Sequence, residues 1–205
     1  MPTLLLIRHG ENDYLAKNRL PGHTPGIHLN KRGSEQAVLL DQSLSKLPIK
    51  AIYCSPLERA VETAQPLAKS LGMEIQLRPE LTDGDVGEWT GRYWKVLRRN
   101  KLWKIIQQKP SQFQFPGGES FVQMQVRVVA TLEAIVGAHK KDEMIAVVFH
   151  ADPIKLAVAN YLGLPLDNFQ RLSINAGSIT ILNTHESSCQ LLGMNLMPPL
   201  PKTKQ

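Results

Sequence analysis

The chain has 205 residues, of which 42% are hydrophobic and 20% charged, and its formal net charge at pH 7 is +6. These values are typical of a globular protein with a sizeable core, and the positive charge favours an anionic partner without choosing between a phosphate ester and a nucleic acid. The first apolar run is too short for a secretion signal or a membrane span, and the two cysteines lie far apart, which argues against a disulfide framework. We therefore expect a cytoplasmic protein with no membrane partner and no cysteine metal site.

Short apolar runs alternate with helical patterns along the chain. The expected strands are Thr3–Ile7, Ala51–Cys54, Glu74–Leu77, Met144–Phe149 and Ser178–Leu182. The expected helices cover residues 30–46, 55–72, 119–139 and 152–163. This alternation predicts an α/β fold, a three-layer sandwich with a mostly parallel central sheet and helices on both faces. We expect a single domain over residues 1–197 and a disordered tail over residues 198–205, which are rich in proline and basic side chains.

Two of the expected helices have well-defined start signals. Ser55 is the expected N-cap of one helix, with Pro56 at its first position and Glu58 completing a capping box. Asp152 followed by Pro153 predicts the same kind of start for a later helix.

Basic or nucleophilic side chains follow three of the expected strands. Arg8 and His9 end the first apolar run, Arg59 falls in the first turn of the helix after the second strand, and His150 ends the fourth run. The carboxyl ends of parallel strands share one edge of the sheet, where ligands bind in such folds. Arginine and a helix N-terminus suit a phosphate, neutral histidine can attack phosphorus, and Gly10 would let the backbone pass close to an anion. Each residue alone fits an ordinary strand end or helix surface, but together they predict a phosphate site.

The chain also resembles the histidine phosphatase superfamily, which includes the cofactor-dependent phosphoglycerate mutases. The segments that carry the resemblance, in the family's order, are Leu6–Glu11, Ser55–Ala60 with Thr63 and Ala64, Val86–Gly91, Pro116–Ser120 and the strand that leads to His150. They span almost the whole sequence. The resemblance implies a sheet with helices on both faces and a pocket that gathers Arg8, His9, Arg59 and His150 around one phosphoryl group.

These residue types support phosphoryl transfer through a covalent intermediate. Neutral His9 attacks phosphorus and becomes phosphohistidine, while the two arginines and a protonated His150 neutralise the transferring oxygens. A carboxylic acid must protonate the leaving alkoxide and then activate water. The resemblance assigns this role to Asp83, where the family more usually has glutamate, and Asp85 is the competing carboxylate. We expect no metal and no other cofactor.

The predicted substrate contacts lie close to these groups in the sequence. They are Arg8, Asn12, Asn18, Arg19, Gly22, Arg59, His150 and Ala151. Leu15 stands where the family commonly has an asparagine at the phosphate, so that Asn12, Asn18 or a backbone group would take its place. Arg19 and Gly22 match an arginine-plus-glycine loop of the family.

Residues 93–104 combine basic and aromatic side chains, a composition that can bind a nucleic-acid strand. Their apolar residues fall near helical spacing, however, which favours a half-buried helix with a solvated basic face. By resemblance this region sits over the active site, where its lysines and arginines could meet a second anionic group of the substrate. A nucleic acid is therefore not the expected partner.

The leading interpretation is a phosphomonoester hydrolase, a metal-independent enzyme like the histidine acid phosphatases, acting on a small phosphorylated metabolite. One alternative is a phosphoryl transferase like phosphoglycerate mutase, although the familiar mutases carry extra sequence. The other is a non-catalytic phosphate or nucleic-acid binder, which would be expected to lose at least one of the four pocket residues. The physiological substrate and the oligomeric state stay open, with a homodimer as one option.

Overall fold

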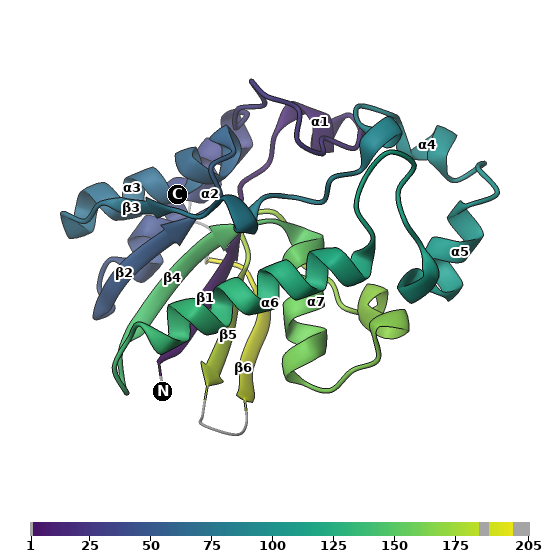
Figure 1. Cartoon of the computed structure of the whole chain (residues 1–205). Coiled ribbons are helices and arrows are strands. Elements are labelled where there is room, and N and C mark those ends of the chain that lie inside the picture. The colour runs from purple at the N-terminus through teal and green to yellow at the C-terminus, as the bar shows by residue number, and fades with distance from the viewer. Residues whose placement is uncertain (1, 185–188, 199–205) are drawn as a thin grey trace.

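The computed structural model describes residues 2–184 and 189–198 (Figure 1). Its central sheet has six strands in the order β3-β2-β4-β1-β5-β6. The strands are β1 Thr3–Arg8, β2 Ile49–Cys54, β3 Ile75–Leu77, β4 Met144–Phe149, β5 Ile179–Thr184 and β6 Cys189–Leu196. Strands β1 to β4 run parallel, whereas β5 pairs antiparallel with β1 and β6 with β5. The expected mostly parallel sheet is confirmed.

Helices cover both faces of this sheet, as predicted (Figure 1). The helices α2 Lys31–Leu44 and α3 Glu58–Leu71 pack on one face. The helices α6 Phe121–Gly137 and α7 Ala151–Tyr161 pack on the other. The three expected layers are therefore present, and both faces of the central strands are removed from water.

The uniform hydrophobicity of β1 follows from this arrangement. Leu4 and Leu6 belong to the cluster on the α6 and α7 side, whereas Leu5 and Ile7 belong to the cluster on the α2 and α3 side. All four side chains are at most 1% exposed. A strand buried on both faces needs apolar residues at every position, so no polar alternation marks it in the sequence.

A third apolar cluster lies beyond the carboxyl ends of the parallel strands, in a lobe built from short elements. The short helices of the chain are α1 Asp13–Ala16, α4 Trp94–Leu97, α5 Trp103–Gln108 and the 3-10 turns η1 Pro79–Leu81, η2 Gly87–Trp89, η3 Pro110–Gln112 and η4 Leu166–Arg171. The prediction of one helix over residues 93–104 is wrong, because α4 and α5 are separate. Between them the Asn100 carboxamide accepts a hydrogen bond from the Leu102 N–H at 2.9 Å, a local side-chain contact that favours a turn.

Both predicted helix starts that rely on a proline pattern are displaced. Helix α3 has Leu57 as its N-cap rather than Ser55, and the Ser55 hydroxyl lies 2.8 Å from Nε2 of His150 instead. Helix α7 has His150 at its N-cap, and the Asp152 carboxylate pairs with the Lys155 ammonium at 2.6 Å. In both cases a tertiary or side-chain contact takes the group that the local pattern assigned to capping.

The last strand, β6, was not predicted. Its side chains are half-buried or exposed, so it lacks the apolar run that marks β1 and β4. The predicted disordered tail over residues 198–205 lies outside the described residues from position 199 onward. Within the described ranges, no helix combines the length and apolar character that crossing a membrane requires.

The loop after β1 passes very close to the start of α2 at two glycines. A Cβ atom on Gly33 would lie 2.0 Å from the carbonyl oxygen of Glu11, and one on Gly10 would lie 2.6 Å from the carbonyl oxygen of Gly33. The close neighbour of Gly10 in the structure is thus the backbone of α2, and its predicted approach to a bound anion stays a prediction. This contact fixes the chain immediately after His9.

Replacing Gly33 with alanine should therefore destabilise the protein. We expect Gly33→Ala to lower the free energy of unfolding by about 1–3 kcal/mol, the usual range for overpacking, in urea denaturation. Gly137→Ala is the matched control, because nothing lies within 4 Å of a Cβ at this position in α6. The control should be neutral or stabilising by up to about 1 kcal/mol. Equal stability of the two variants would contradict the close approach.

Candidate active site

Three neighbouring strands end side by side and align the first residues of the site. The His9 N–H donates to the Phe149 carbonyl at 3.0 Å, and the Ser55 N–H donates to the Val148 carbonyl at 2.9 Å. His150 follows directly in the chain, and its ring centroid lies 5.1 Å from that of His9. The parallel register of β1, β4 and β2 thus brings together residues that are far apart in the sequence.

His9 is held as a neutral imidazole with one nitrogen free. It is 2% exposed, and its Nδ1 lies 2.7 Å from the carbonyl oxygen of Gly10. A carbonyl can only accept, so Nδ1 carries the ring proton and Nε2 keeps a lone pair. Burial, together with the nearby His150 and the two arginines, lowers the pKa of His9 well below its usual range. The side chain has the protonation state that a nucleophile requires.

The two arginines present buried donors to the same place. Arg59 is 0% exposed; its Nη2 donates to the Gly22 carbonyl at 2.9 Å and lies 3.2 Å from Oδ2 of Asp83. Arg8 donates through Nη1 to the Ile174 carbonyl at 2.6 Å. Nε and Nη1 of Arg59 and Nε of Arg8 are buried without a hydrogen-bond partner in the described part of the chain. Such donors are suited to an oxyanion.

His150 supplies a further donor. It is 0% exposed, its Nε2 contacts the Ser55 hydroxyl at 2.8 Å, and its Nδ1 lies 3.7 Å from Oδ2 of Asp83. Burial and the two arginines lower the pKa of His150 well below its usual range, so the expected protonated form is disfavoured in the free protein. When Ser55 donates its hydroxyl hydrogen to Nε2, the proton on Nδ1 is available to an anion.

These groups adjoin a cavity of about 230 Å³. The predicted site residues that line it are Arg8, His9, Gly22, Asp83 and Ala151. Arg59 and His150 lie against the same carboxylate, because Oδ2 of Asp83 faces both. The structure thus brings together all five residues that the sequence analysis predicted to be catalytic.

Besides Arg59 and His150, three predicted substrate contacts lie outside the cavity lining: Asn12, Asn18 and Arg19. Asn12 is buried, and its Oδ1 caps helix α1 by accepting from the Leu15 N–H at 2.9 Å. Asn18 is exposed, and Nε of Arg19 donates to the Gly91 carbonyl at 2.9 Å. Leu15 itself lines the cavity, so neither asparagine replaces it there. These contacts support loops, and Nδ2 of buried Asn12 has no hydrogen-bond partner among the described residues, so its predicted contact with the substrate stays a prediction.

Asp83 and Asp85 differ clearly in their surroundings. The Asp83 side chain is 20% exposed and lines the cavity, and its Oδ1 accepts from the Gly84 N–H at 3.0 Å. Asp85 is exposed, and its carboxylate accepts from the Gly87 N–H at 3.1 Å. The geometry favours Asp83 as the acid.

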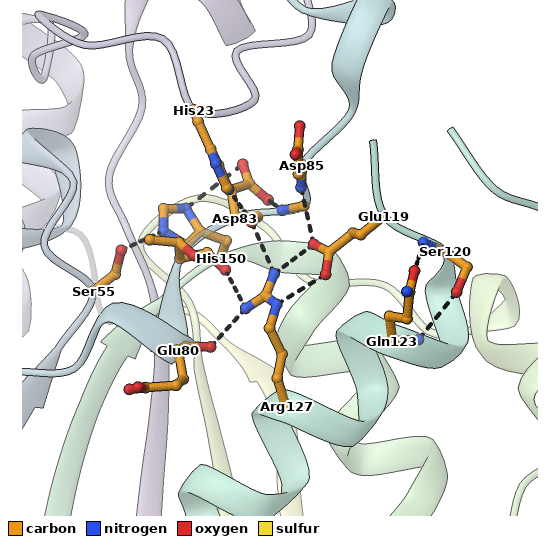
Figure 2. A network of polar contacts seen from close by, with 12 residues as sticks. His23, Ser55, Glu80, Asp83, Asp85, Glu119, Ser120, Gln123, Arg127 and His150 are labelled. Carbon is orange, nitrogen blue, oxygen red and sulfur yellow. Dashed lines mark hydrogen bonds and ion pairs between the residues drawn. The ribbon is translucent and has the colours of Figure 1, made fainter. Parts of the chain in front are cut away.

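Arg127 of helix α6 holds the loop that carries this acid (Figure 2). Its guanidinium donates to the carbonyls of Glu80 at 2.6 Å and Asp83 at 2.9 Å, and it binds both carboxylate oxygens of Glu119 at 2.6 and 2.9 Å. Glu119 in turn accepts from the Asp85 N–H at 2.9 Å. Arg127 was not predicted from the sequence, because its loop partners lie more than 40 residues away and no local pattern connects them.

The segment 93–104 borders the cavity with its aromatic side chains and not with its charges. Trp94 and Trp103 line the cavity that His9 adjoins, which fits the expectation that the segment sits over the site. Arg98 and Lys101 are exposed and lie outside the lining, so the expected contact with a second anionic group has no support here. Among the described residues, no group of three or more His, Cys, Asp or Glu side chains is placed to hold a metal ion.

The lowered pKa values of His9 and His150 predict an unusual titration in the free protein. In NMR spectra both rings should keep neutral-form shifts as the pH falls through 6.5, their ordinary value. Exposed His28, whose pKa is raised by Glu62, is the internal control and should titrate above 6.5. Below pH 6.5 the unfolded chain then binds more protons than the folded one. The free energy of unfolding should therefore decrease as the pH is lowered from 6.5. Titration of His9 near pH 6.5 would contradict the neutral nucleophile.

Comparison with known proteins agrees with this geometry. The family model described as "Histidine phosphatase superfamily (branch 1)" matches residues 4–197. Phosphoserine phosphatase 1 of Hydrogenobacter thermophilus is 29% identical, over 96% of this chain and 93% of its own. Adenosylcobalamin/alpha-ribazole phosphatase of Escherichia coli is 27% identical, over 94% and 95%. The structure of a mycobacterial glucosyl-3-phosphoglycerate phosphatase complexed with VO3 has a TM-score of 0.88 and 25% identity, over 96% and 100%.

These matches confirm the expected enzyme class, a phosphatase that acts on small phosphorylated compounds. They also agree with the six-stranded sheet and its flanking helices. The chain belongs to the histidine phosphatase superfamily, branch 1.

Proposed function

We propose that the chain hydrolyses phosphomonoesters through a phosphohistidine formed at His9, without a metal ion. The observation that carries the proposal is the set of buried, unpartnered donors on Arg8, Arg59 and His150 around a neutral histidine. A phosphoryl group has the charge and the oxygen atoms that would satisfy these donors. The similarity to phosphatases supports the same reaction class.

In the first step, the lone pair of His9 Nε2 forms the N–P bond while the ester P–O bond breaks in line. The guanidinium groups of Arg8 and Arg59 and the Nδ1–H of His150 stabilise the non-bridging oxygens. The leaving alkoxide takes a proton from Asp83, so that a neutral alcohol departs. The arginines supply positive charge at the transferring group, which is the contribution that a metal ion makes in other phosphatases.

In the second step, the Asp83 carboxylate removes a proton from water, and the water oxygen attacks phosphorus as the P–N bond breaks. This restores the protonated acid and neutral His9 and releases inorganic phosphate. In the free protein Asp83 is paired with Arg59. A phosphate dianion that takes over Arg59 and lies beside Asp83 favours the protonated acid, as the first step requires.

Three finer expectations from the sequence are retained as part of this proposal, namely a single domain over residues 1–197, a cytoplasmic location and the absence of a nucleic-acid partner. A homodimer stays one option for the oligomeric state. The mechanism needs none of them, because every residue named in it comes from one chain.

The covalent step predicts a trapped intermediate. Rapid quench of the protein with a 32P-labelled ester should give an adduct that is labile in acid and stable in base, and His9→Ala should abolish both adduct and turnover. His28→Ala, a change at an exposed histidine, is the matched control and should retain both. Activity should also persist in a metal chelator. Turnover by His9→Ala, or a loss in chelator that a divalent cation restores, would contradict the proposal.

The acid step predicts a dependence on the leaving group. General acid catalysis contributes about 10² to 10⁴ in rate, and a basic alkoxide needs it more than a stabilised phenolate. Asp83→Asn should therefore slow hydrolysis of an alkyl phosphate by about that factor while largely sparing 4-nitrophenyl phosphate. Asp85→Asn is the matched control and should affect both esters little. The reverse pattern would assign the acid to Asp85.

Arg127→Lys adds a test of the loop that carries the acid. It keeps the charge but loses the planar fork that binds Glu119 and the loop carbonyls. We expect Arg127→Lys to lose less activity than Asp83→Asn does, and to lose more of it on the alkyl ester than on the aryl ester, as Asp83→Asn does. An equal loss on both esters would indicate a general structural effect.

A further inference from the structure

Beyond the phosphate-binding groups, the cavity wall is dominated by large apolar side chains. It is lined from separate segments of the chain by Leu15 of α1, Trp94 of α4, Trp103 of α5, Phe121 of α6 and Phe115 in the loop before α6. The phosphate end, with Arg8, His9 and Asp83, borders the same space. The group attached to the phosphoryl oxygen would therefore face this apolar wall.

Ring contacts hold the wall in place. The rings of Trp94 and Trp103 meet edge to face with centroids 5.8 Å apart, and Phe115 meets Phe121 at 5.3 Å and Trp89 at 5.7 Å. Edge-to-face pairs at these separations are favourable beyond simple burial. These side chains belong to the apolar cluster of the lobe or pack against it, so the wall is a built feature of the fold.

Charge at the cavity wall outside the phosphate site is neutralised. Lys155 is 15% exposed on its side chain, and its ammonium lies 2.6 Å from the Asp152 carboxylate and 5.1 Å over the ring of Phe169. The other polar side-chain groups of this part of the lining are neutral, namely the carboxamide of Gln170 and the indole N–H groups of Trp89, Trp94 and Trp103. A substrate with a carboxylate on its organic part would have to compete with Asp152 for the ammonium, and that competition disfavours such a substrate.

The cavity volume limits the size of the organic group. The cavity measures about 230 Å³, part of which the phosphoryl group would occupy. An apolar cavity of about 150 Å³ holds a benzene molecule. The remaining space therefore fits one aromatic ring or an aliphatic group of similar bulk.

We propose that the preferred substrates are phosphomonoesters whose organic part is uncharged, predominantly apolar and about the size of one aromatic ring. This inference rests on the proposed phosphatase activity of the same site. It differs from recognition by charge, because the wall offers aromatic surface, indole N–H groups and one carboxamide where the substrate's organic part lies. The exposed arginines and lysines of the segment 93–104 take no part in it.

The test compares primary alkyl phosphates, because their leaving alkoxides make similar demands on the acid. The probes are 2-phenylethyl phosphate, ethyl phosphate and O-phosphoserine, with inorganic phosphate release as the readout. We expect kcat/KM for 2-phenylethyl phosphate to exceed that for ethyl phosphate and for O-phosphoserine by at least about 10-fold, the lower end of what one apolar contact difference gives.

Variants on one helix separate the wall from the general stability of the lobe. Trp103→Ala should reduce the preference for 2-phenylethyl over ethyl phosphate several-fold. Ile105→Ala is the matched control, because Ile105 lies in the same helix, is 39% exposed and lies outside the cavity lining. It should leave the preference unchanged. Asp152→Asn should free Lys155 and raise kcat/KM for O-phosphoserine relative to ethyl phosphate.

The outcomes distinguish this inference from the proposed function. If none of the three esters nor 4-nitrophenyl phosphate is hydrolysed, the proposed function fails. If all are hydrolysed and O-phosphoserine matches or exceeds 2-phenylethyl phosphate, the phosphatase stands and the apolar substrate class is overturned. An unchanged preference in Trp103→Ala would likewise overturn the role of the wall.

Discussion

The constraint on which the site depends is the complete burial of a positive charge. Arg59 is 0% exposed and can be tolerated there only with a counter-charge and hydrogen-bond acceptors. In the free protein the Asp83 carboxylate supplies the counter-charge and the Gly22 carbonyl supplies one acceptor. Two nitrogens of Arg59, Nε and Nη1, have no partner among the described residues. In the proposed mechanism a phosphoryl group completes the set, and its negative charge beside the released Asp83 side chain favours the protonated carboxyl that acts as the acid. One buried guanidinium thus links the stability of the empty site, its affinity for phosphate and the availability of the proton donor.

The proposed phosphoryl site and the apolar wall lie in different parts of the molecule, at the edge of the sheet and in the lobe of short helices. The ends of β1, β2 and β4 hold the groups proposed to bind and transfer the phosphoryl group, in positions fixed by strand register. The short helices α4 and α5 supply part of the apolar wall that the organic group would meet. The acid loop lies between them, held to helix α6 by Arg127. Such an arrangement allows the lobe to change its preference for organic groups while the chemistry at the strand ends stays the same.

The sequence alone was sufficient for those features that depend on local pattern. Buried strands are recognisable in the sequence as apolar runs. Strand-end residues such as His9 and His150 lie close together because the carboxyl ends of parallel strands lie at the same edge of the sheet. Asp83 came from resemblance, since no spacing rule identifies a loop acid. Ser55 was misassigned as a helix cap because its hydroxyl contacts His150, a partner that no local pattern reveals. The contacts of Arg127 with the Asp83 loop and the apolar wall could not be predicted for the same reason, because both form only when distant segments of the chain pack together.

The central claim is that buried donors around neutral His9 form a receptor for a pentacoordinate phosphoryl group. A crystal structure of the wild-type protein with orthovanadate tests it most directly. Vanadium should lie within bonding distance of His9 Nε2, with its oxygens within hydrogen-bond distance of Arg8, Arg59 and His150, and Asp83 should have left Arg59. Vanadate bound away from His9, or an Arg59 that still pairs only with Asp83 and Gly22 in the complex, would contradict the account.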